Sequence, residues 1–266
     1  MQMDIMKREQ QEGIRINKYL SEAGICSRRA ADREIENGNV WINGRQAVNG
    51  DRVLPGMKVI FCGKEVHPET EEIMIAFHKP VGIVCTAEKR EKQNIIDFIN
   101  YPKRIYPVGR LDKDSEGLIL LTNQGDLVNK MMRAGNYHEK EYLVRVNRPV
   151  TEAFLSGMAK GGIPVQEQQT RPCKVEKTGE RTFRIILTQG LNRQIRRMCE
   201  YFGYQVVKLK RIRIMNIMLG DLPTGSYREI SREEQEELYR RIQGSSNQPV
   251  RENRGRREEW KKKDSE

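Results

Sequence analysis

The chain has 266 residues and a formal net charge of +11 at pH 7, from 48 Lys and Arg against 37 Asp and Glu. This length suits one or two domains with a substantial core, and the positive excess favours a polyanionic partner over an acidic small molecule. Five cysteines, none in a CxxC pair, argue against a disulfide framework and against a zinc knuckle.

Residues 1–13 are mostly polar and charged, and we expect them to be flexible. No apolar run approaches the length of a signal-peptide core or of a membrane span. The sequence therefore predicts a cytoplasmic protein without membrane contact.

Residues 14–66 are predicted to form two helices followed by short strands. The first helix covers 17–23, and Ser27 is placed to cap a second helix over 28–37. Asn43-Gly44 then fits a tight hairpin turn between two strands. Residues 67–72, which carry a proline and several acids, are typical of a linker.

From residue 73 the chain alternates short apolar strands with helices. Strands are predicted over 73–77, 82–86, 117–122, 141–146 and 182–188, and helices near 125–133, 151–160 and 192–202. This mixed order predicts an α+β domain over residues 73–242, with flanking helices packed against a mixed, largely antiparallel sheet.

The C-terminal region changes character at Ser231. A capping box from Ser231 to Glu234 predicts a short amphipathic helix. Residues 243–266 hold almost only polar and charged side chains, so they cannot bury enough apolar area to fold alone. We expect a disordered charged tail, which either lengthens an RNA contact or only aids solubility.

One carboxylate stands out in the segment GRLDKDSEGLILLT, residues 109–122. Asp112 follows an arginine and precedes a polar turn and then an apolar run, which predicts a short buried strand with an acid at its mouth. Asp114 and Glu116 share that turn, whereas the opposed acids of a glycosidase usually come from separate strands. The three histidines are far apart in sequence and share no metal-ligand spacing, so no metal site is expected.

Four segments match, in order, the motifs of one enzyme family. They are FHKPVGIVCT (77–86), the segment with Asp112, HEKEYLVRV (138–146) and GLNRQIRRMCEYFGY (190–204). The layout of residues 14–66 also resembles the S4 RNA-binding domain. Together these features resemble the RsuA/RluB/RluE/RluF family of ribosomal RNA pseudouridine synthases.

The resemblance implies an S4 domain followed by a pseudouridine synthase catalytic domain. The expected activity is isomerisation of a uridine in a stem-loop of 23S ribosomal RNA, with a tRNA anticodon stem-loop allowed as a second substrate. No cofactor is implied, and we expect a monomer. A non-catalytic RNA-binding factor for ribosome assembly, with the same fold, is the alternative.

The resemblance also assigns roles to individual residues. Asp112 is the catalytic acid, Arg196 is its guanidinium partner, and Tyr142 stacks on the target uracil. The other candidates for contact with substrate or RNA are Arg110, Lys79, Leu209, Arg193 and Arg197, and in the S4 region Arg15, Lys18, Arg28 and Arg29. Asp112 must be ionised to act as a nucleophile or as a base, and the sequence leaves these two routes open.

The helical spacing of residues 192–202 supports a buried position for Arg196. Ile195, Met198, Cys199 and Phe202 form an apolar stripe, and Arg196 lies beside it while Arg193 and Arg197 can face RNA. A basic surface helix with all three arginines solvated is the alternative.

Two strands carry the remaining assignments. Tyr142 alternates with Val144 and Val146 on one face, a pattern that an ordinary core tyrosine would also show. In the strand near 206–215, Leu209 and Ile212 are predicted on a core face. Lys208, Lys210, Arg211 and Arg213 are predicted on a phosphate-tracking face.

Overall fold

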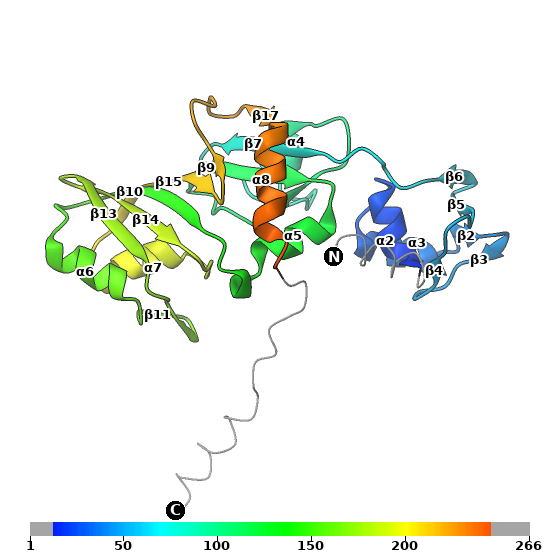
Figure 1. Ribbon diagram of the computed structural model, residues 1–266. Helices are drawn as coiled ribbons and strands as arrows, with labels where there is room; N and C mark the ends of the chain where they lie inside the picture. Colours follow the sequence, from blue (N-terminus) through cyan, green and yellow to red (C-terminus); the bar gives the residue numbers. More distant parts are fainter. Residues whose placement is uncertain (1–12, 246–266) are drawn as a thin grey trace, which may run out of the picture.

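The computed structural model describes residues 13–245, which form a small N-terminal domain and a larger sheet domain (Figure 1). Residues 1–12 and 246–266 hold nearly all of the predicted N-terminal extension and charged tail, and they lie outside the described residues. Over the described part, no helix combines the length and the apolar character needed to cross a membrane.

The N-terminal domain contains the two predicted helices and the predicted hairpin. Its elements are β1 (Ile14–Arg15), α2 (Ile16–Glu22), α3 (Arg28–Glu36), β2 (Val40–Ile42), β3 (Arg45–Gln46), β4 (Arg52–Val53), β5 (Val59–Phe61) and β6 (Lys64–Val66). The Ser27 hydroxyl accepts a hydrogen bond from the Ala30 amide at 3.2 Å, as expected of a helix cap. Asn43 and Gly44 both have positive φ, which the tight turn between β2 and β3 requires.

The larger domain is built on one mixed sheet of nine strands in the order β13-β14-β10-β15-β9-β7-β17, with β16 beside β15 and β8 beside β9. The strands are β7 (Met74–Lys79), β8 (Tyr106–Val108), β9 (Glu116–Thr122), β10 (Lys140–Val146), β13 (Lys174–Gly179), β14 (Thr182–Leu187), β15 (Val206–Ile214), β16 (Ile217–Met218) and β17 (Tyr227–Glu229). Only β9 and β15 pair in parallel among these strands, so the predicted largely antiparallel sheet is confirmed.

Helices cover both faces of this sheet (Figure 1). They are α4 (Ile95–Ile99), α5 (Gly125–Met132), α6 (Glu152–Lys160), α7 (Gln194–Tyr201) and α8 (Arg232–Ile242), with a 3₁₀ turn at Ala134–Asn136 and a small hairpin of β11 (Pro164–Val165) and β12 (Gln168–Gln169). The capping box predicted at Ser231 is present at the start of α8.

Strand β9 is buried on both faces, which explains its uninterrupted apolar sequence. Leu118 and Leu120 pack in one core cluster with α5 and α8, whereas Ile119 and Leu121 pack in a second cluster with α4. A third cluster joins α6 and α7 to β10 and β14. The segment with Asp112 therefore leads directly into the centre of the domain.

The two halves of the sheet meet where β9 pairs with β15. Gly117 has φ +113° and lies opposite Arg211, and a Cβ at Gly117 would overlap the backbone of Arg211. Only glycine permits this close approach. The loop that carries Asp112 enters the sheet at this junction.

One predicted strand is wrong. Residues 82–86 form no strand, and Val84 makes only an isolated bridge with Asn94. Gly82 adopts a positive φ just after β7, so the chain turns there. The amide and carbonyl of Val84 then bond to Gln93 and Ile95 in a loop.

Candidate active site

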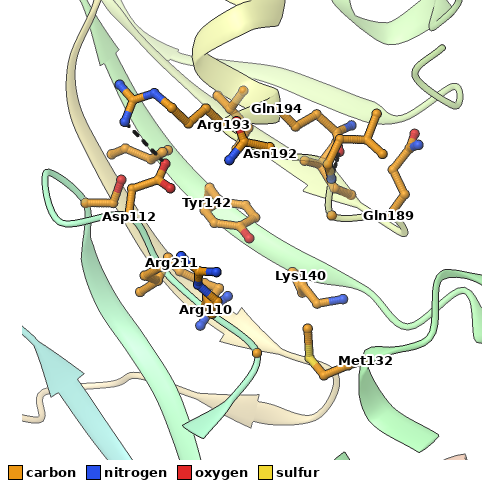
Figure 2. A pocket seen from close by; sticks show the side chains of 18 residues that line it. Arg110, Asp112, Met132, Lys140, Tyr142, Gln189, Asn192, Arg193, Gln194 and Arg211 are labelled. Carbon is orange, nitrogen blue, oxygen red and sulfur yellow. Dashed lines mark hydrogen bonds and ion pairs between the residues drawn. The ribbon is translucent and has the colours of Figure 1, made fainter. Parts of the chain in front are cut away.

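A cavity of about 370 Å³ opens at the junction of the two half-sheets (Figure 2). Most of its lining comes from the loop with Asp112, strand β10, strand β15 and the loop that leads into α7, and Met132 of α5 and Leu187 of β14 complete it. Among the described residues that line this cavity, Asp112 is the one that bears a carboxylate. Three of the four segments that match the family motifs thus converge on one acid, and residues 77–86 do not line the cavity.

Asp112 is held by the backbone around it. Its carbonyl accepts a hydrogen bond from the Ser115 amide at 3.1 Å, which closes a tight turn. The neighbouring Lys113 carbonyl accepts from the Gly82 amide at 2.7 Å, so the loop after β7 buttresses this turn. The Asp112 side chain is about one-third exposed, and Figure 2 shows it pointing toward Arg193 at the rim of the cavity.

The predicted pairing of Arg196 with Asp112 is wrong in this structure. The arginine nearest to Asp112 is Arg193, whose Nη1 lies 3.8 Å from the Asp112 carboxylate. Arg196 is buried and places its Nη2 at 3.3 Å from the Asp114 carboxylate, 2.9 Å from the Asp114 carbonyl and 3.3 Å from the Ser115 hydroxyl. Arg196 therefore holds the turn that follows the catalytic loop.

Arg193 and Asp114 form a second link across the cavity rim. Arg193 donates to both carboxylate oxygens of Asp114, at 3.2 and 3.1 Å. Partial burial raises the pKa of Asp114, but the Arg193 hydrogen bond and the charges of Arg196 and Arg193 outweigh it, so the pKa lies below its ordinary value. Asp114 thus remains ionised and ties the loop to the start of α7.

Tyr142 lies at the centre of the cavity wall (Figure 2). It is half-buried and packs against two of the core clusters, one on each side of the junction. Leu209, from the neighbouring strand, is buried and also lines the cavity. An exposed aromatic face beside apolar side chains is suited to receive an unstacked base.

Arg110 and Lys79, both predicted to contact the substrate or RNA, lie in different positions relative to the cavity. Arg110 is exposed and lines the cavity next to Asp112. Lys79 is fully buried and lies behind the wall, where its ammonium donates to the carbonyls of Pro80 and Ser115 at 2.8 and 2.7 Å. Burial lowers the pKa of Lys79. Lys79 therefore shapes the cleft and does not line it.

Of the four residues of the S4-type domain that were predicted to contact RNA, the three arginines are exposed and the lysine is engaged in an ion pair. Arg15, Arg28 and Arg29 are exposed, and their contact with RNA stays a prediction. Lys18, also predicted to contact RNA, is instead largely buried and pairs with Asp126 of α5 at 2.9 Å. Arg197 is partly buried and donates to Asn192, outside the cavity.

Two cavity residues were missed by the sequence reasoning, Lys140 and Arg211. Both are buried and both line the cavity. Arg211 was predicted on a solvent-facing, phosphate-tracking face, but it shares the buried face of β15 with Leu209. The sequence did contain evidence for this position, because residues 209 and 211 of a strand point to the same face.

Comparisons with known proteins agree with this geometry. A family model described as RNA pseudouridylate synthase matches residues 73–201, and an S4 domain model matches residues 14–59. The dual-specificity RNA pseudouridine synthase RluF of Escherichia coli K12 is 55% identical over 237 residues, which cover 88% of this chain and 81% of that protein. Ribosomal large subunit pseudouridine synthase B of Bacillus subtilis is 34% identical, over 84% of this chain and 95% of that protein.

A solved structure supports the same assignment. A crystal structure of a pseudouridylate synthase superposes with a TM-score of 0.63 at 28% identity, covering 85% of this chain and 100% of the other. The chain belongs to the RNA pseudouridine synthases and is an isomerase with an S4 domain ahead of its catalytic domain. Within them, the predicted membership of the RsuA/RluB/RluE/RluF family and the likeness to its RluF members are confirmed.

Proposed function

We propose that this enzyme isomerises a uridine in a stem-loop of 23S ribosomal RNA and accepts a tRNA anticodon stem-loop as a second substrate. The names of two relatives support this assignment, since one is called dual-specificity and the other is called a ribosomal large subunit enzyme. The enzyme acts as a monomer in the cytoplasm, where these RNAs are found.

Asp112 starts the reaction. In its ionised form it attacks the ribose or the base, or it removes a proton from the sugar. The C1′–N1 bond breaks and its electron pair stays on the uracil, which turns and forms a bond from C5 to C1′. The C5 proton is then lost to solvent and N1 gains a proton, so the product is an isomer of the starting nucleotide. The observation that carries this proposal is that one carboxylate, that of Asp112, lines the cavity among the described residues.

Tyr142 receives the extruded base. A nucleotide that leaves its stack loses its aromatic contacts, and stacking on an aromatic side chain such as Tyr142 returns about 1–3 kcal/mol. Arg110, which is exposed beside Asp112, binds the displaced nucleotide, and Leu209 packs against the uracil from the next strand. Arg193 places a positive charge 3.8 Å from the Asp112 carboxylate.

The test is release of tritium from C5-labelled uridine in transcripts of 23S ribosomal RNA and of tRNA. The wild-type enzyme should release tritium from both, and Asp112→Asn should release none while it still binds RNA. Asp221→Asn, an exposed acid that does not line the cavity, is the matched control and should keep full activity. A wild type that binds RNA without releasing tritium would favour the non-catalytic assembly factor.

A further inference from the structure

Two buried cations line the cavity on the side of Tyr142 (Figure 2). Arg211, on β15, is 2% exposed, and Lys140, on β10, is 7% exposed. They belong to the two strands that carry Leu209 and Tyr142, so they are part of the wall against which the base rests. The steps of bond cleavage and base stacking described above use neither of them.

The hydrogen-bonding capacity of both side chains is mostly unused. Arg211 donates from Nε to the Leu118 carbonyl at 2.7 Å, but its buried Nη2 has no partner among the described residues. Within residues 13–245, Lys140 donates one long hydrogen bond, to the His138 carbonyl at 3.3 Å. Neither side chain forms an ion pair with a carboxylate of the described residues.

The lack of counter-ions is not shared by the next inward-facing arginine of the strand. Arg213, two residues along the same strand, pairs with Glu139 at 3.0 Å and with Glu141 at 2.6 Å. A buried cation without a partner costs several kcal/mol relative to water. Burial, followed by the charge of Arg211, lowers the pKa of Lys140 to about 8. This lowered pKa shows that the site disfavours the charged form of the lysine. An anionic ligand in the cavity would offset it.

The register of the strands aims both groups at one place. Arg211 lies directly opposite Tyr142 in the β10–β15 ladder, and Lys140 is two residues before Tyr142, with a bulge between Glu141 and Tyr142. A uracil stacked on the Tyr142 ring would therefore have the edge of its ring near both cations. That edge carries the two carbonyl oxygens, O2 and O4.

We propose that Lys140 and Arg211 donate hydrogen bonds to the carbonyl oxygens of the uracil and stabilise the negative charge it carries after release from the ribose. When the C1′–N1 bond breaks, the electron pair on N1 delocalises onto O2 and O4. The two cations hold this anion while it turns, and the charge disappears when the C5 to C1′ bond forms and N1 is protonated. The inference rests on the proposed initiation by Asp112.

Single-turnover rates with the labelled 23S transcript test the proposal. Lys140→Met and Arg211→Met should each lower the rate by about 10²–10³-fold, the usual loss when one preorganised donor is removed, and should leave RNA affinity unchanged. Lys140→Arg keeps the charge and should recover most of the rate. Lys177→Met, which removes an exposed lysine from β13 of the same sheet, is the matched control.

Two outcomes would overturn the proposal. One is a wild-type rate in Lys140→Met, provided that the wild type itself releases tritium. The other is a loss of RNA affinity with a smaller salt dependence and an unchanged rate at saturating RNA, because this pattern marks a contact with a flanking phosphate. Failure of the Asp112 assignment is seen separately, as tritium release by Asp112→Asn.

The pH profile supplies a readout that a purely structural role would not move. Because Lys140 is charged below its pKa of about 8, the wild-type rate should fall as the pH rises through about 8. Lys140→Arg should lack this fall. The charged groups around Lys140 are Arg211 on β15, His138 before β10, and Arg110 and Asp112 on the facing loop. The same fall in wild type and Lys140→Arg would contradict the proposal.

Discussion

The S4-type domain and the catalytic cavity both present basic side chains without carboxylate partners, but they hold them in opposite environments. Arg28 and Arg29 are exposed at the start of α3 and form no ion pair with the described residues. Arg211 and Lys140 are buried in the cavity wall. The first pair remains hydrated and screened by salt, whereas the second pair has already lost its water.

This difference separates affinity from rate. Exposed arginines attract phosphates over the length of the RNA, and their contribution falls steeply with salt. Buried cations act at short range on a charge that develops during the reaction, where screening is weak. We therefore expect changes in the S4-type domain to alter RNA binding and changes around the cavity to alter turnover.

The largest effect is expected from Gly117→Ala, which disturbs the strands beside the cavity and leaves the S4-type domain unchanged. The new Cβ would overlap the backbone of Arg211, and φ +113° is unfavourable for alanine. We expect a loss of about 3–5 kcal/mol in the free energy of unfolding, together with loss of turnover. Urea unfolding followed by circular dichroism measures it. Gly44→Ala, with positive φ but open space around it, is the control and should lose less.

Arg196→Met should lower turnover strongly without weakening RNA binding. Removal of the guanidinium leaves the Asp114 carboxylate with Arg193 alone and removes hydrogen bonds to the Asp114 carbonyl and the Ser115 hydroxyl. Hydrogen bonds to charged groups contribute about 1.5–3 kcal/mol each, so we expect a rate loss of about 10–100-fold as the Asp112 loop loosens. Tritium release under single-turnover conditions measures it.

A matched change tests whether this effect acts through the loop. Asp114→Asn removes the same ion pair from the other side, so its rate loss should not add to that of Arg196→Met in the double variant. Fully additive losses would mean that Arg196 acts independently of the Asp114 carboxylate, as in the pairing with Asp112 that the resemblance implies.

The sequence predicted the placement of Asp112 well because local rules determine it. A polar turn followed by the continuous apolar run of β9 requires a strand buried on both faces, and the loop before such a strand opens at its end. The helices, the Ser27 cap and the Asn43-Gly44 turn follow from similar short-range signals. Each of these features has a signal within a few consecutive residues.

The side-chain partners could not be predicted in the same way. Helical period correctly indicated that Arg196 is buried, but it does not fix where a long side chain ends, and the guanidinium reaches Asp114. Arg193 reaches Asp112 from a left-handed backbone conformation ahead of α7, which no periodicity indicates. Arg211 was assigned to solvent because arginine is usually exposed, although the strand period favoured the buried face.

A charge reversal in the S4-type domain tests the affinity side of the comparison. Arg28→Glu with Arg29→Glu should weaken binding of the 23S transcript by about 10–100-fold at low salt and reduce the slope of log affinity against log salt. The rate at saturating RNA should stay at the wild-type level. Filter binding at several salt concentrations measures both quantities.

A control for net charge is available on α8. Arg232→Glu with Arg240→Glu changes the total charge equally at exposed positions far along the chain from α3. If both double variants lose the same affinity, the effect is one of overall charge and not of the α3 terminus. Unchanged affinity in the Arg28 and Arg29 variant would remove the assigned role of the S4-type domain.

The smallest effect is expected where the two regions touch. Lys18 of α2 pairs with Asp126 of α5 at 2.9 Å, and Arg104 also donates to the Ser21 carbonyl across the same boundary at 3.2 Å. A partly exposed pair contributes about 0.2–1 kcal/mol, so Asp126→Asn should raise KM by no more than about fivefold and leave kcat unchanged. Asp221→Asn provides the matched control. A fall in kcat would mean that the S4-type domain helps to position the cavity, and the separation of affinity from rate would then fail at this boundary.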